Sequence, residues 1–165
     1  MKQNIPVWLA ILVGLLSGIL MGLINGALIH FTGINAFIIT LGTSFLYRGL
    51  ALIVTRGTPV SKLPAAYRAF GGGDIFQVES GVYMALLVLL LSIPLLYKMR
   101  WGHYITTLGG NPVALRRCGV RTGAWRISTF AVMGFLAALA GIIISARLNS
   151  AEPNAGLNME MDAIT

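Results

Sequence analysis

Residues 5–29 read IPVWLAILVGLLSGILMGLINGALI and contain no charged side chain. A helix needs about 20 apolar residues to cross a hydrocarbon layer roughly 30 Å thick, and this segment is long enough. It therefore predicts a membrane-spanning helix.

The composition of the whole chain agrees with this prediction. Of its 165 residues, 56% are hydrophobic and only 10% are charged, and the mean hydropathy is +0.81. Soluble domains carry roughly 25% charged residues, so this chain has too little charge to cover a water-soluble core. The same composition excludes intrinsic disorder, which requires low hydrophobicity and high charge.

Three further apolar segments are candidates for membrane spans, at about residues 34–54, 81–97 and 127–146. The segment at 81–97 is short and contains Pro94. We expect an all-α, polytopic membrane protein with about four spans, in which residues 1–165 form a single, partial transmembrane domain. Residues 30–33 are expected to be a tight hairpin between the first two spans.

The charges are distributed unevenly between the loops. Residues 98–126 carry six Lys and Arg residues and no acidic residue, whereas residues 55–80 and 147–165 hold all five acidic residues. Cytoplasmic loops collect Lys and Arg, so we expect residues 98–126 inside the cell and the other two segments outside. Because such loops account for the net charge of +7, that charge does not indicate a nucleic-acid partner. The first residue falls outside and the chain ends at the start of a hydrophobic run, so we expect a fragment of a longer protein.

Small residues recur along two of the spans. Spacing of four places them on one face of a helix, where a second helix can approach closely. We predict helix packing, with the lining of a pathway as the alternative, for Gly14, Gly18, Gly22 and Gly26 in the first span and for Gly134, Ala138 and Gly141 in the last.

Three polar residues inside the spans are candidates for pathway-facing or interhelix groups. Asn25 needs a hydrogen-bond partner, either on another helix or on a substrate. Thr43 can also bond back to a carbonyl of its own helix. Arg48 lies near the outer end of its span, where it can extend to the interface or serve as a paired or pathway-facing cation.

The sequence contains no group of residues typical of an enzyme. No carboxylate pairs with a histidine at a spacing that suggests acid–base catalysis. His30 and His103 have no neighbouring ligands, so we predict neither a metal site nor a cofactor. The predicted spans also lack an Asp, Glu or Lys near the middle of the bilayer, which indicates that any energy for transport comes from another chain.

A short helix is predicted inside the basic loop. Asn111 is a good N-cap, Pro112 suits the first helical position, and Gly119 suits the residue just past the end. Arg116 and Arg117 favour the negative C-terminus of such a helix. The helix is either a structured connector or a projection that docks onto a cytosolic partner.

Residues 102–120, GHYITTLGGNPVALRRCGV, resemble the cytoplasmic coupling segment of permease subunits from the ribose/xylose-type branch of bacterial ATP-binding-cassette (ABC) sugar importers. Further motifs resemble that family in the same order: GLING at 22–26, FIITLGT at 37–43, ALAG at 138–141 and SAEPNAG at 150–156. The chain departs from the pattern at Leu115, where a second alanine is usual, and at His103, where arginine is frequent.

The resemblance implies a permease subunit of the bacterial inner membrane that moves a sugar or sugar-like solute. It also implies three partners: a cytosolic ATP-binding subunit, a second permease subunit and an extracytoplasmic solute-binding protein. The segment contacted by the ATP-binding subunit would contain Asn111, Pro112, Ala114, Leu115 and Gly119. The alternative is a non-transport membrane scaffold whose basic loop binds anionic lipid. Neither reading identifies the solute.

Overall fold

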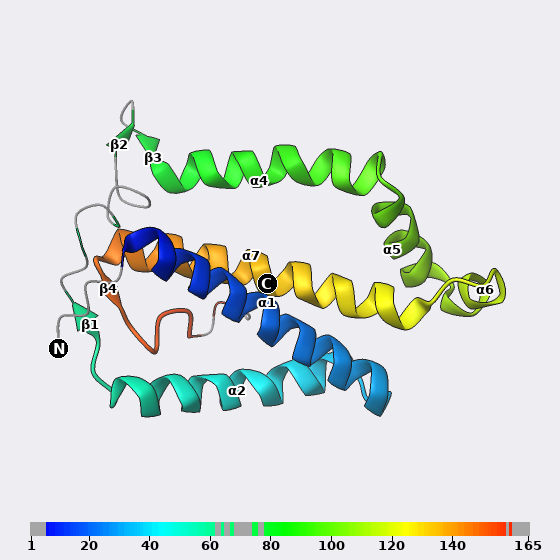
Figure 1. The fold of residues 1–165 in the computed structure, drawn as a ribbon, viewed down its shortest axis with the longest axis horizontal. Helices are drawn as coiled ribbons and strands as arrows, with labels where there is room; N and C mark the ends of the chain where they lie inside the picture. Colours follow the sequence, from blue (N-terminus) through cyan, green and yellow to red (C-terminus); the bar gives the residue numbers. More distant parts are fainter. Residues whose placement is uncertain are drawn as a thin grey trace.

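The computed structural model describes residues 6–61, 64, 67, 74–75, 78–157 and 159. Four long helices run roughly along one direction: α1 (Val7–Thr32), α2 (Ala36–Thr55), α4 (Ser80–Tyr97) and α7 (Thr122–Leu148). In Figure 1, α2 and α4 lie on opposite sides of the pair formed by α1 and α7.

The two ends of this bundle differ. At one end lie α5 (Arg100–Gly110) and α6 (Pro112–Arg117), together with the turn between α1 and α2 (Figure 1). We call it the basic end, because all six Lys and Arg residues of 98–126 belong to it. At the other end, β1 (Val60–Ser61) pairs antiparallel with β4 (Ser150–Ala151), and β2 (Asp74–Ile75) pairs antiparallel with β3 (Val78–Glu79).

The prediction of about four spans is confirmed. Three helices, α1, α2 and α7, are each long and apolar enough to cross a membrane. The predicted span at 81–97 forms α4, which meets that criterion together with α5, and the two helices are bent by 74° relative to each other. Pro94 lies inside α4, and the break follows it at Lys98 and Met99.

Two predicted boundaries are wrong. The expected hairpin at residues 30–33 is shorter, because α1 continues through Thr32. The turn instead uses Gly33 in a left-handed conformation with φ 67°, and the side chain of Asn35 caps α2 by accepting from the Phe37 amide at 3.0 Å. The last span begins at Thr122 rather than near 127, which places Arg126 inside α7.

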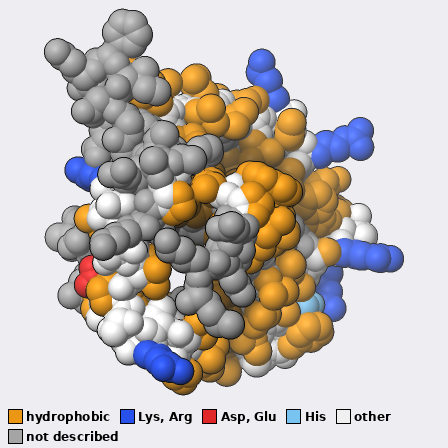
Figure 2. All heavy atoms as spheres, turned by 60° about the vertical axis from the view of Figure 1, so that its left-hand side comes forward, with side chains coloured by type: hydrophobic (Ala, Val, Ile, Leu, Met, Phe, Trp, Pro, Cys, Tyr) orange, Lys and Arg blue, Asp and Glu red, His pale blue; other side chains and the backbone are white. Residues whose placement is uncertain are grey.

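The surface of the described structure is largely apolar. Phe31 and Val54 are 80% and 82% exposed, and large aliphatic side chains of α1, α2 and α4 are also exposed. Figure 2 shows apolar side chains over most of the described surface on the face in view. Apolar surface of this extent is typical of a protein that contacts lipid or further helices rather than water.

Candidate functional site

A cavity of about 1020 Å³ lies between α1, α2 and α7. The last residue of β4 and the segment after it contribute to its wall at the end away from the basic end, through Ala151, Glu152, Pro153 and Ala155. Most of the lining is apolar, as expected for a site that binds small molecules through a few well-placed polar groups. The small residues of the helix faces contribute to it: Gly14, Gly18, Gly22, Gly134, Ala137, Ala138 and Gly141.

Asn25 and Tyr47 form the main polar contact between α1 and α2 in this cavity. The Tyr47 hydroxyl donates to Asn25 Oδ1 at 3.2 Å and lies 3.4 Å from the carbonyl oxygen of Met21. The Asn25 amide nitrogen has no hydrogen-bond acceptor among the described residues. This nitrogen is also not fully buried, so another molecule can reach it. Its two N–H donors are therefore available to a hydroxyl group in the cavity.

The other two polar candidates do not line this cavity. The Thr43 hydroxyl bonds within its own helix, to the carbonyl oxygens of Ile39 at 3.0 Å and Thr40 at 3.1 Å. Among the described residues Thr43 thus follows the alternative of a bond back to its own helix. Arg48 is half-buried on α2 and also lies outside the lining. Thr40, which lies close to Thr43 along α2, does contribute to the wall.

The closest helix contact in the described structure joins α1 to α7, which run antiparallel. A Cβ atom added at Gly18, Gly22, Gly26 or Gly134 would stand 3.0 Å or less from atoms of the opposite helix, mostly backbone. Only glycine fits at these positions without moving a helix. Ala138 belongs to the same contact, because its own Cβ faces Gly18.

The predicted glycines do not all share this role. At Gly14 an added Cβ would make ordinary van der Waals contact with Ile142, at 3.5 Å. At Gly141 it would meet no atom within 4 Å. In the described structure Gly141 therefore contacts no other helix and lines the cavity, which is the alternative predicted for these small residues.

The short helix predicted in the basic loop is present as α6. The Asn111 side chain accepts from the Ala114 amide at 3.0 Å, and Pro112 occupies the first helical position. At the other end Gly119 has φ 79°, its amide donates to the Arg116 carbonyl at 3.1 Å, and the Val120 amide reaches back to Leu115 at 3.3 Å. This pair of bonds is the Schellman arrangement that commonly ends a helix.

The two faces of α6 differ in exposure. Leu115 is buried, with only 7% of its surface exposed, whereas Val113 is 60% exposed and Ala114 is also exposed. Leu115 thus attaches α6 to the rest of the protein, and Val113 and Ala114 are left available to a partner.

Aromatic contacts hold the neighbouring helix α5 against α7. The Trp101 indole donates to the Ser128 hydroxyl at 3.3 Å, and the rings of Tyr104 and Trp125 lie 4.8 Å apart between centroids. Gly102 packs against the backbone of Leu96 at the bend between α4 and α5, where a Cβ would overlap with Leu96. Because α6 follows α5 directly, these contacts connect α6 to the first half of α7.

Sequence reasoning missed three parts of the site. It did not identify Tyr47 as the partner of Asn25, although a tyrosine within a predicted span was a usable signal. It did not predict α5, and it did not predict the pairing of β1 with β4. A further contact at that end is Tyr67, whose hydroxyl lies 2.7 Å from the Ser145 hydroxyl of α7.

The sequence matches, over residues 1–165, the family described as branched-chain amino acid transport system / permease component. Among similar proteins is the ribose import permease protein RbsC of Haemophilus influenzae, 36% identical over 98% of this chain and 51% of that protein. The D-allose transport system permease protein AlsC of Escherichia coli is 35% identical over 96% of this chain and 49% of its own length.

The autoinducer 2 import system permease protein LsrC of Yersinia pestis is 35% identical over 94% of this chain and 43% of that protein. The chain thus spans about half the length of the curated relatives it matches. No solved structure matches the chain. These relatives are transport permeases, so the alternative of a non-transport scaffold finds no support among them.

Proposed function

Because the chain belongs to the branched-chain amino acid transport system / permease component family, we propose that it is part of a permease subunit of an ABC importer. The subunit moves a sugar or sugar-like solute across the bacterial inner membrane. The named relatives import ribose, D-allose and autoinducer 2, which are small polar molecules.

The cavity between α1, α2 and α7 is the observation that carries this proposal. Its volume of about 1020 Å³ is at the upper end of the range, roughly 300–1,000 Å³, that is usual for sites that bind small molecules. The amide donors of Asn25 and the hydroxyl of Tyr47 are suited to hydrogen bonding with the hydroxyl groups of a sugar. We propose that this pair contacts the solute on its pathway.

The energy for transport is proposed to enter through α6. A cytosolic ATP-binding subunit would contact the exposed side of α6 at Val113 and Ala114, while Asn111, Pro112 and Gly119 hold the helix in shape. Leu115 and the aromatic contacts of α5 attach this region to α7, so a displacement of α6 would move α7 with it. The two other proposed partners are a second permease subunit and an extracytoplasmic solute-binding protein.

The direct contact between α7 and α1 extends this mechanical connection to the cavity. Gly18, Gly22 and Gly134 form that contact and also line the cavity. A shift of α7 along or away from α1 therefore changes the shape of the cavity. This geometry supports alternating access, in which nucleotide-dependent states of the partner favour different arrangements of the helices.

The proposal is tested by measuring uptake of labelled ribose or allose into proteoliposomes that contain the whole permease, its ATP-binding subunit and its binding protein. Two variants, Asn25→Leu and Tyr47→Phe, each remove one polar group of the pair proposed to contact the solute. We expect each to lower the apparent affinity or rate of uptake by about three- to tenfold, the value of one hydrogen bond.

The matched control is Thr43→Val, which removes a hydroxyl from α2 outside the cavity. It should leave uptake unchanged, because the Thr43 hydroxyl finds its partners among the described residues within its own helix. Uptake by Asn25→Leu and Tyr47→Phe at the rate of the control would contradict the proposed pathway. Failure of all proteins, wild type included, to transport any sugar in the presence of ATP would contradict the importer itself.

A further inference from the structure

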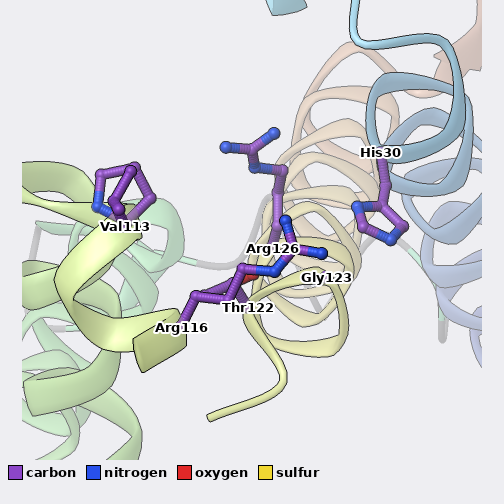
Figure 3. Close-up of a pocket in the computed structure, with 7 residues that line it drawn as sticks. His30, Val113, Arg116, Thr122, Gly123 and Arg126 are labelled. Atoms are coloured by element: carbon purple, nitrogen blue, oxygen red, sulfur yellow. The ribbon is translucent and has the colours of Figure 1, made fainter. Parts of the chain in front are cut away.

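A second, smaller pocket of about 350 Å³ opens at the basic end, between α1, α6 and α7. It is lined by His30 near the end of α1, by Pro112, Val113 and Arg116 of α6, and by Thr122, Gly123 and Arg126 of α7. Figure 3 shows the Arg116 side chain extending from α6 toward α7 and the His30 ring projecting from α1 into the same region. Three separate elements thus contribute basic side chains to one pocket.

No described residue of this chain balances the positive charge of this pocket. Neither Arg116 nor Arg126 has an ion-pair or hydrogen-bond partner for its guanidinium group among the described residues. The sequence contains no Asp or Glu between Ser80 and Ala151, so neither α5, α6 nor α7 offers a carboxylate. An anion in the pocket would be attracted by both guanidinium groups, since Arg116 and Arg126 both line it.

The backbone adds to the positive potential. The first turn of α7 contains no acidic residue and no side chain caps it, and the Gly123 amide has no acceptor among the described residues. The N-terminus of a helix of this length carries a partial positive charge and free N–H donors. Gly123 lies directly against the His30 ring, and a Cβ at this position would overlap with that ring.

We propose that this pocket binds a phosphate group. Arginine forms paired hydrogen bonds with phosphate oxygens, and a helix N-terminus contributes backbone donors to the same group. The pocket lies where α1 ends and α7 begins, the level at which spans meet the lipid headgroups. Its phosphate has two possible sources, the headgroup of an anionic phospholipid and free phosphate in the cytosol. This site is separate from the cavity between α1, α2 and α7, and its occupancy does not depend on which solute is carried.

The test measures equilibrium binding to the whole purified permease in a non-ionic detergent at constant ionic strength. One arm titrates a short-chain phosphatidylglycerol, a second titrates the matching phosphatidylcholine, and a third titrates inorganic phosphate. We expect phosphatidylglycerol to bind more tightly than phosphatidylcholine. Binding of inorganic phosphate with similar affinity identifies free phosphate as the source, and its absence identifies the lipid headgroup; both results support a phosphate site.

The deciding comparison is between two double variants with the same net charge. Arg116→Gln with Arg126→Gln removes the cations of the pocket, whereas Arg117→Gln with Arg121→Gln removes two exposed cations nearby. We expect the first to weaken binding by on the order of tenfold or more and the second by less than about threefold. Equal weakening in both would overturn the proposal, because it indicates general attraction to a basic surface.

A third variant leaves the charge unchanged. Gly123→Ala adds a methyl group where the His30 ring meets α7, so it narrows the pocket and should also weaken binding. Thermal unfolding of each variant establishes that it is folded. If no phosphate-containing probe binds the wild-type permease, or if Gly123→Ala and the pocket double variant both bind as tightly as wild type, the pocket is not a phosphate site.

Discussion

The contact between α1 and α7 makes a quantitative prediction for Gly134→Ala. The new Cβ would stand 3.0 Å from the Gly22 Cα and 3.1 Å from the Gly18 carbonyl carbon, and nearer still to the Gly18 carbonyl oxygen. Carbon atoms in unstrained contact are about 3.5–4.0 Å apart, so α1 and α7 must separate by on the order of 0.5–1 Å. The atoms in the way are backbone, so no side chain can rotate to make room.

The expected cost follows from this geometry. Overpacking of a well-fitted contact costs about 1–3 kcal/mol, and replacing a helical glycine by alanine returns up to about 1 kcal/mol. The control is Gly141→Ala, seven positions later in α7, where the new Cβ would meet no atom within 4 Å. Gly141→Ala gains the stability of alanine over glycine in a helix and has no overpacking cost. Gly134→Ala should therefore be less stable than Gly141→Ala by about 1–3 kcal/mol.

The comparison is made by unfolding the permease in mixed micelles with increasing amounts of a denaturing detergent. The midpoints of wild type and both variants are converted to free energies of unfolding under identical conditions. Gly141→Ala should unfold at or above the wild-type midpoint, and Gly134→Ala should unfold below it. If Gly134→Ala is as stable as Gly141→Ala, the close approach of α1 and α7 is not what holds this pair together.

Two further predictions concern α6. Leu115→Ala removes a buried side chain and should destabilise the permease by about 2–4 kcal/mol. Val113→Ala, on the exposed side, should change stability by less than about 0.5 kcal/mol. Equal losses of stability in thermal unfolding would contradict the assignment of the two faces of α6. Ala114→Trp should reduce the ATP hydrolysis that depends on the permease. The thermal stability of the permease should not fall, because Ala114 is exposed. Unchanged hydrolysis would show that Ala114 does not touch the ATP-binding subunit.

The elements predicted well from the sequence are those whose determinants are local. Spans follow from runs of apolar residues, and the position of α6 follows from Asn111, Pro112 and Gly119, which act on the backbone within a few residues of themselves. The glycines of α1 were also recognisable, because spacing of four places them on one face whatever the partner helix is. For all of these the sequence contains the physical cause within one or two helical turns.

The missed features depend on how separate segments are placed. Residues 100–110 contain three glycines and two threonines, which are weak helix formers. Their helix forms nevertheless, with Trp101 and Tyr104 packed against α7. Thr43 and Gly141 each had two predicted roles, because the choice between those roles depends on the rotation of α2 and α7 about their axes. That rotation is set by contacts between helices and is not visible in either segment alone.

The cavity and the contact between α1 and α7 share residues, and this restricts how the permease can change. Gly18, Gly22 and Gly134 both hold the two helices together and leave part of the cavity open. A larger side chain at any of these three positions would occupy part of the cavity and would also separate the two helices. The position of α7 and the shape of the cavity are therefore coupled, and a displacement of α7 that begins at α6 necessarily reaches the wall next to Asn25. Substitutions that change the contacts with the solute and leave the contact between α1 and α7 in place should accordingly be found at Asn25 and Tyr47, which line the cavity outside the glycine contact.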